Sequence, residues 1–408
     1  MRKVLIALVV FLLAAAASAK ELSVLWFYDD PSELAFVKQA FAEYTAQHPD
    51  VTFKLNTVSY DNLFTKVTQL IAGGTPPDIV KLTDVRPEFA PFVLDLSKYE
   101  GKDFLKPFIP GVARGMERGG KIIGAPLDVT ANGIILNKSY FQKAGVSIPN
   151  EQTGWTWTEF EKAIREVTTK TQARFPLVWD VTPHRWLTFL YENGGSIFKD
   201  NGTANGFDTQ ASINALTKFA AMNHDGLMPL SVWGGTDNPR DLFFSGQAVA
   251  WMSGSWQVKA MEDGIKNFDW TAGPNPSVTT RSSVLGYKFV SAFNTSKYPA
   301  DAADFIRFFT SKEMQRKYAQ QLTVIPARTD VGTVDYGNPQ ATEALNNLAY
   351  ELKISPLAAS SDVTNPAIAY VWDTLKENIV AVTLKQETPQ QAVTKVSAAI
   401  DKGLAATH

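Results

Sequence analysis

The stretch Leu22-Ser-Val-Leu-Trp-Phe27 is a short apolar run that predicts a buried β-strand, and the polar cluster Tyr28-Asp-Asp-Pro31 ends it. The next segments alternate between helical and strand-like spacing of apolar residues, over 32–48, 50–55, 60–71 and 78–82. Strand, helix, strand, helix and strand in this order predict an α/β fold with a mostly parallel sheet. Ligands of such sheets bind beyond the carboxyl ends of the strands.

Composition narrows the class of protein. The 408 residues are 45% hydrophobic and 20% charged, an ordinary globular balance that suggests two to three domains. Because 39 basic residues face 41 acidic ones, we expect no nucleic-acid partner. The absence of Cys excludes disulfides, thiolate catalysis and Cys-type metal sites, and the four His do not form an HExxH motif. We expect no cofactor and no metal ion.

The amino terminus predicts export. Two basic residues precede an apolar run over 4–17, and Ala17-Ser-Ala19 offers the small residues of a cleavage site. Fourteen residues of helix rise about 21 Å, short of the roughly 30 Å hydrocarbon core of a membrane. We therefore expect residues 1–19 to be a cleaved signal peptide rather than an anchor. With no Cys for acylation, a periplasmic protein is expected and a lipoprotein is not.

Motifs of catalysis are weak. Residues 115–121 fit GxxxxGK, but Ile122 stands where a P-loop has Ser or Thr. GxSxG and GxGxxG are absent from the sequence, so we expect no enzyme. A secreted glycoside hydrolase stays open as an alternative, because Trp and Asp residues in a cleft serve such enzymes equally well.

Tryptophan is the most informative residue type. Eight of the ten Trp lie in residues 155–270, and most are expected to pack in the core. Trp179, Trp233, Trp256 and Trp372 stand beside Asp or Gly, where a flat ring can face solvent. An aromatic ring beside carboxylates suits a ligand with C–H faces and hydroxyl edges, which describes a sugar.

Five blocks of sequence carry a resemblance to a known family. The most specific is Phe244-Ser-Gly-Gln-Ala-Val-Ala-Trp-Met-Ser-Gly-Ser-Trp256. The others cover residues 72–80, 125–145, 155–160 and 299–328. Together, and in this order, they resemble the extracellular solute-binding proteins of ABC importers, in the maltose-binding-protein class.

The resemblance implies a two-lobed α/β fold with three crossings between the lobes and a ligand cleft between them. The crossings are expected near 126–130, 284–287 and 326–330. The N-terminal lobe would then hold 20–127 plus 287–327, and the C-terminal lobe 128–286 plus 328–408. Closure of the lobes about a hinge would trap the ligand. The implied protein is a monomer that delivers a sugar to the membrane subunits of an ABC permease.

The predicted ligand-binding residues come from strand ends, from the Trp set and from the crossings. They are Tyr28, Asp29, Asp30, Tyr60, Asp84, Asp128, Thr130, Trp179, Trp233, Trp256, Gly286, Tyr287, Arg328 and Trp372. The resemblance assigns sugar stacking to Trp256 and Trp372, and carboxylates among the set are expected to bind hydroxyls.

The ligand is expected to be a neutral mono- or disaccharide. Members of the class that bind glycerol phosphate carry an Arg near the position of Ala369, and the loop 179–186 does not match the maltose binders closely. A polyol, a polyamine or a glycerophosphodiester stays open, since carboxylates and aromatic faces also suit a polyamine.

Overall fold

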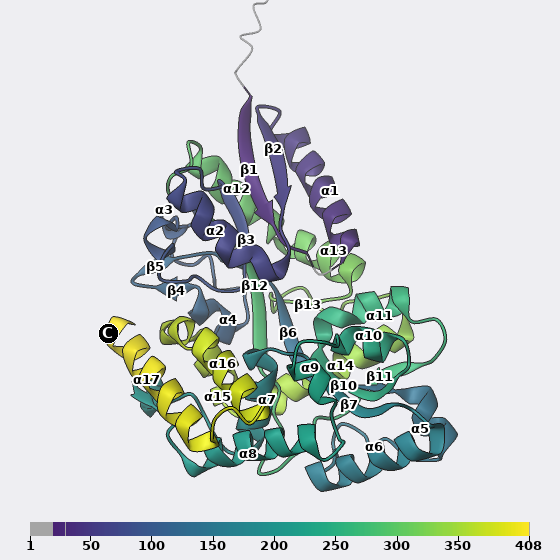
Figure 1. Cartoon of the computed structure of the whole chain (residues 1–408). Helices are drawn as coiled ribbons and strands as arrows, with labels where there is room; N and C mark the ends of the chain where they lie inside the picture. The colour runs from purple at the N-terminus through teal and green to yellow at the C-terminus, as the bar shows by residue number, and fades with distance from the viewer. Residues whose placement is uncertain (1–18, 29, 408) are drawn as a thin grey trace, which may run out of the picture.

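The computed structural model describes residues 19–28 and 30–407 (Figure 1). The predicted signal peptide lies outside the described residues except for Ala19, and so does the predicted ligand-binding residue Asp29. Within the described part of the chain, no helix is long and apolar enough to cross a membrane.

The first lobe is built on the predicted parallel strands. Strand β1 (Lys20–Trp26) lies between β2 (Val51–Thr57) and β3 (Ile79–Leu82), parallel to both. Helices α1 (Pro31–Gln47) and α2 (Leu63–Ala72) connect them. The Asp30 side chain accepts the Ser32 N–H and caps α1, and Pro31 opens its first turn. The predicted order of strands and helices is confirmed.

Two long strands carry the sheet from one lobe to the other. The main sheet of the described chain has the order β2-β1-β3-β12-β6-β10-β7. Strand β6 (Ala125–Asn137) pairs with β12 (Leu285–Ala292) through its first half and with β10 (Ala248–Gly254) through its second. All thirteen residues of β6 are buried, as expected for a strand inside both lobes.

The three predicted crossing segments lie side by side at this point. Gly286 on β12 faces Thr130 on β6, and Val129 pairs with Ile325 of β13 (Ile325–Pro326). Because β12 and β13 come late in the chain, residues far apart in sequence meet at the junction.

The second lobe completes the sheet and carries most of the helices. Its strands are β7 (Phe175–Trp179) beside β10, and β11 (Trp270–Ala272) beside β6. Its longer helices are α6 (Trp157–Thr171), α7 (Pro183–Glu192), α8 (Gln210–His224), α14 (Pro339–Ile354), α16 (Trp372–Thr383) and α17 (Pro389–Thr407). The C-terminal helix α17 packs against α8 and α16 (Figure 1).

The remaining elements are shorter or connect the two lobes. Helices α12 (Pro299–Phe309) and α13 (Lys312–Leu322) return to the first lobe and pack against α1 (Figure 1). The short helices are α3 (Ser97–Glu100), α4 (Pro110–Gly115), α5 (Lys138–Ala144), α9 (Leu230–Trp233), α10 (Pro239–Phe244), α11 (Val258–Gly264) and α15 (Ala358–Thr364). The short strands are β4 (Glu117–Arg118), β5 (Lys121–Ile122), β8 (Phe198–Lys199) and β9 (Ala204–Asn205). Single 3₁₀ turns are η1 (Tyr60–Asn62), η2 (Ala90–Phe92), η3 (Asp200–Gly202), η4 (Ser255–Gln257) and η5 (Pro366–Tyr370).

A buried ion pair lies at the heart of the first lobe. Lys81 of β3 is fully buried and bonds Glu33 in the first turn of α1. The same carboxylate oxygen accepts from Trp26 Nε1 at 2.8 Å and from the Tyr318 hydroxyl at 2.7 Å. The Lys81 ammonium also lies 4.3 Å from the centre of the Phe27 ring. This cluster fixes α1 and α13 against the ends of β1 and β3.

Candidate functional site

Strands β6 and β12 approach each other closely at the junction, where Gly286 and Thr130 are paired across the antiparallel ladder. An ideal Cβ on Gly286 would lie 2.1 Å from Thr130 Oγ1 and 3.4 Å from His184 Cε1. Glycine permits this approach, because a side chain at 286 would overlap the Thr130 hydroxyl in its present position. Two predicted site residues, Thr130 and Gly286, meet here.

Asp84 lies at the carboxyl end of β3 and presents one unused acceptor. Its Oδ1 accepts the Val85 N–H at 2.7 Å and an Arg118 N–H at 3.2 Å. Its Oδ2 is buried and has no hydrogen-bond partner among the described residues. Burial raises the pKa of Tyr287 to about 12, and the nearby Arg118 guanidinium opposes this rise. Asp84 and Tyr287, both predicted, thus flank Arg118, which the sequence analysis missed.

Asp128 is buried and paired with a cation. Its Oδ1 lies 3.3 Å from the Lys288 ammonium, and the side chains are 0% and 7% exposed. Asp128 of β6 and Lys288 of β12 face each other directly in the antiparallel register. The sheet therefore places a neutralised carboxylate at the junction rather than a free one.

Tyr28 and Tyr60 are the exposed aromatic residues at the strand ends of the first lobe. They are 37% and 44% exposed, and the Tyr60 ring packs 5.3 Å from that of Phe27. Asp30, by contrast, uses its side chain to cap α1. The two tyrosines are therefore open to solvent, whereas the Asp30 side chain stabilises the start of α1.

Trp256 lies in η4, directly after β10, and a cation covers its ring. The Arg185 guanidinium is 3.9 Å from the ring centre. Arg185 Nε in turn lies 3.7 Å from Asp180 Oδ2. Asp180 follows the last residue of β7, and Trp251 and Ser253 of β10 donate to it, each at 2.7 Å. Burial raises the pKa of this carboxyl group.

Trp372 begins α16 and lies near His184. Their ring centres are 6.0 Å apart, and the His184 Nδ1 lies 3.2 Å from the Asn132 amide nitrogen. Burial, helped by the neighbouring Arg185, lowers the pKa of His184 to about 3, so its imidazole is neutral at physiological pH. Next to Trp372, Asp373 lies 3.8 Å from Arg86 of the first lobe.

The expectation that Trp179 and Trp233 face solvent is wrong. They are 1% and 3% exposed. Trp179 packs on Trp157 and Phe219, and Trp233 packs on the same Phe219. The prediction relied on the polar neighbour Asp180. Trp179 packs in the core of the lobe at the end of β7, whereas Asp180 accepts hydrogen bonds from Trp251 and Ser253.

Arg328 is also engaged away from the other predicted residues. Its Nε and Nη2 donate to the two carboxylate oxygens of Asp330, at 2.9 and 2.8 Å. The guanidinium lies over the ring of Phe108. This paired arrangement commits the donors of Arg328 to a local contact.

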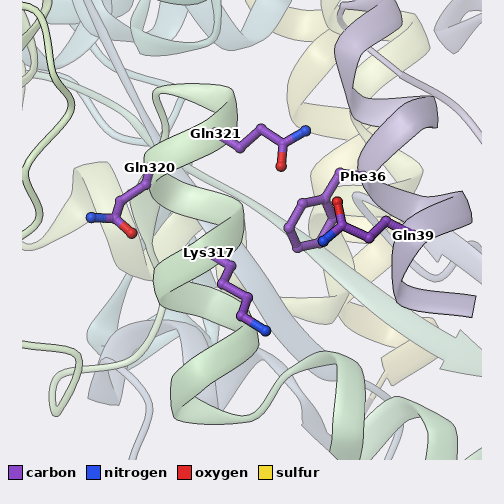
Figure 2. Close-up of a pocket in the computed structure, with 5 residues that line it drawn as sticks. All are labelled: Phe36, Gln39, Lys317, Gln320 and Gln321. Carbon is purple, nitrogen blue, oxygen red and sulfur yellow. The ribbon is translucent and has the colours of Figure 1, made fainter. Parts of the chain in front are cut away.

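Two cavities among the described residues lie outside the junction. One, of about 410 Å³, opens between α1 and α13 on the first lobe and is lined by Phe36, Gln39, Lys317, Gln320 and Gln321 (Figure 2). The other, of about 230 Å³, lies between α6 and α8. Neither is lined by a predicted ligand-binding residue.

Comparison with known proteins finds relatives that include two sugar-binding proteins. The chain is 27% identical to a lactose-binding protein of Rhizobium radiobacter over 315 residues, 74% of this chain and 73% of that protein. It is 22% identical to a multiple sugar-binding protein of Streptococcus mutans, covering 88% and 83% of the two chains.

Solved structures share the fold at lower identity. A substrate-binding protein of Listeria monocytogenes in complex with cycloalternan superposes with a TM-score of 0.80 at 22% identity, over 95% of this chain and 99% of that one. Maltose-bound MalE3 of T. maritima gives 0.75 at 20% identity, over 94% and 99%. The model of the bacterial extracellular solute-binding protein family matches residues 28–316, and the chain belongs to that family.

Proposed function

We propose that this protein binds a neutral mono- or disaccharide outside the cytoplasm and delivers it to the membrane subunits of an ABC importer. The observation that carries the proposal is the charge balance at the junction. Asp84, Asp128 and Asp180 each face a cation, Arg118, Lys288 and Arg185 respectively. Trp372 lies near His184, the neighbour of Arg185 in sequence, and supplies an aromatic surface of the kind that sugars favour, whereas Trp256 carries the Arg185 guanidinium on its ring.

Charge balance argues against the charged alternatives. A polyamine needs carboxylates in excess of the cations around them, and a glycerophosphodiester needs a cation that no carboxylate neutralises. At the junction the carboxylates and cations occur in pairs, and Arg328 is paired with Asp330. A neutral polyol meets the same charge condition as a sugar, but it has no ring that could stack on Trp372.

The unused acceptor of Asp84 suits a hydroxyl group. A carboxylate oxygen buried without a donor costs about 1–3 kcal/mol or more, and a sugar hydroxyl would satisfy it. Asp84→Asn should therefore weaken sugar binding by roughly tenfold, because a hydrogen bond to a charged acceptor contributes about 1.5 kcal/mol or more.

Lobe closure is the proposed mechanism. The lobes would comprise 20–127 plus 287–327 and 128–286 plus 328–408, and would move about the strands at the junction. The Arg86–Asp373 pair joins them at 3.8 Å. A ligand that contacts both lobes stabilises the closed arrangement by its differential affinity for it. The closed form would be the one that the permease recognises.

We also propose that the protein has no catalytic activity, against the alternative of a glycoside hydrolase. A glycosidase needs a carboxyl group with a raised pKa as its acid. At the junction Asp180 has a raised pKa, but its oxygens accept from Trp251 and Ser253 and face Arg185. Recovery of unchanged sugar after long incubation would support a protein that binds without catalysis. Release of a monosaccharide would refute this part of the proposal.

A thermal-shift screen of residues 20–408 tests the proposal directly. The panel contains sugars, polyols, polyamines and glycerophosphodiesters. A ligand at about 100 times its Kd stabilises the folded state by roughly 2.7 kcal/mol, which raises Tm by a few degrees. A shift with one sugar supports the proposal. A response to a charged ligand alone contradicts it.

The proposed location is the periplasm, after removal of residues 1–19. The intact mass of the protein recovered from the exported fraction measures this directly. A mass that includes residues 1–19 would contradict the proposed cleavage.

A further inference from the structure

We propose that Arg185 determines which sugar the second lobe accepts, by donating its guanidinium N–H groups to sugar oxygens from a fixed position over Trp256. The inference rests on the proposed carbohydrate binding and adds a residue, a bond direction and a selectivity to it.

Asp180 fixes Arg185 from one side. Asp180 is 9% exposed, and each of its oxygens accepts a hydrogen bond from β10, from Trp251 Nε1 and from Ser253 Oγ. These two bonds prevent the carboxylate from turning. It therefore holds the Nε side of Arg185, 3.7 Å away, in one place.

Trp256 fixes the guanidinium from the other side. The 3.9 Å separation between the guanidinium carbon and the ring centre is a close stacking contact. The indole packs closely on Gly254, since an ideal Cβ at that residue would lie 2.1 Å from Trp256 Cζ3. Arg185 thus lies between a buried carboxylate and a packed aromatic ring, with its side chain 17% exposed.

This arrangement changes what a ligand meets at Trp256. The sequence predicts a sugar ring on the indole, but a planar cation already covers one face of it. Moving Arg185 away would leave the buried Asp180 charge without its cation, which is strongly unfavourable. The ligand is therefore expected to bind beside the stacked pair and to contact the guanidinium.

The chemistry of the guanidinium sets the selectivity. It has N–H donors in one plane and no acceptor, so only acceptor atoms of a ligand, such as oxygen, can bond to it. Because Asp180 balances its charge, hydroxyl and ring oxygens of a neutral sugar suffice. A deoxy sugar that lacks the contacting oxygen loses this hydrogen bond and should bind more weakly.

The test compares Arg185→Lys, Arg185→Ala and Asp180→Asn with the wild type by calorimetry. The probe is the sugar that stabilises the wild type most in the panel, together with its monodeoxy analogues. Arg185→Lys keeps the charge but loses the planar donor set, and should bind at least tenfold more weakly. Arg185→Ala should in addition lose the discrimination between the sugar and one deoxy analogue.

A matched control and a spectroscopic signal accompany these variants. Arg174 also stacks on an aromatic ring, that of Phe175, but is exposed on the surface of the second lobe, so Arg174→Ala should bind as the wild type does. Trp256 emission, taken as the difference from Trp256→Phe, should change in Arg185→Lys and in Asp180→Asn without ligand. That change reports the positioning by Asp180, and circular dichroism confirms that each variant is folded.

Each outcome has a distinct meaning. Weaker binding, lost discrimination and altered Trp256 emission support the inference. If the wild type binds a sugar and Arg185→Ala binds it equally well or more tightly, the inference is overturned. The proposed function is preserved in that case. If no sugar binds the wild type, the proposed function fails, and the inference fails with it.

Discussion

Replacing Gly286 with Ala tests the close approach of β12 to β6 at the junction. The added Cβ would lie 2.1 Å from Thr130 Oγ1, whereas carbon and oxygen atoms without a bond between them need about 3.4 Å. The strands must therefore separate by about 1.3 Å, or the Thr130 side chain must turn inside a buried sheet. Overpacking of this kind costs about 1–3 kcal/mol. We expect the free energy of unfolding to fall by about 2 kcal/mol.

A second substitution isolates the cause. Thr130→Ala removes Oγ1, and the next atoms are His184 Cε1 at 3.4 Å and Thr130 Cβ at 3.5 Å, which are tolerable contacts. Gly286→Ala combined with Thr130→Ala should therefore recover most of the loss. Gly111→Ala is the matched control, because its Cβ would meet only Leu285 Cδ2, at 3.8 Å. The backbone of Gly286 is not left-handed, so strain in φ adds nothing.

Urea unfolding followed by Trp fluorescence measures these differences, and calorimetry with the bound sugar measures the effect on the junction. Gly286→Ala as stable as the wild type would refute the steric argument. A double variant no more stable than the single one would show that the overlap with Thr130 is not the cause.

Three further predictions concern stability, pH and binding. Lys81→Ala leaves the buried Glu33 carboxylate without its cation and should cost about 3–5 kcal/mol in urea unfolding; Lys81→Met together with Glu33→Gln should cost much less, and equal losses would contradict this account. Burial raises the pKa of Asp362 from 3.8 to about 7, so the folded state binds this proton more tightly than the unfolded state does. Its contribution to stability is full below about pH 4 and is lost as the pH rises to about 7, and Asp362→Asn should flatten that part of the stability profile. Trp372→Ala should weaken sugar binding about tenfold, the equivalent of about 1.4 kcal/mol, whereas unchanged affinity by calorimetry would exclude stacking at this residue.

The spacing of apolar residues predicted the secondary structure well, because the burial and backbone geometry of a helix or strand determine which neighbouring positions are apolar. The apolar run 22–27 and the alternation over 50–55 correspond to β1 and β2. Helix α16 ends at Thr383, and Pro389 begins α17. Proline lacks the N–H that a continuing helix requires and opens the next one instead.

The site was less predictable, because tertiary contacts decide the environment of a side chain. Trp179 and Trp233 have polar neighbours in sequence but lie in the core. Arg185 stands unmarked at the start of a helix, and only the fold brings it to Asp180 and Trp256. Lys81 sits in an apolar strand where no local signal announces the Glu33 that neutralises it. The charged Lys81 inside an apolar strand is itself the one sequence signal that indicates a buried ion pair.

The position of β12 in the sheet has a consequence for synthesis and export. Strand β3 pairs with β12, which follows it by roughly 200 residues, after almost all of the second lobe's strands. The sheet of the first lobe therefore cannot close while the chain emerges amino terminus first. In the proposed export, the first lobe would complete its sheet only after most of the polypeptide has crossed the membrane, so the chain would reach the translocation channel without a finished first lobe.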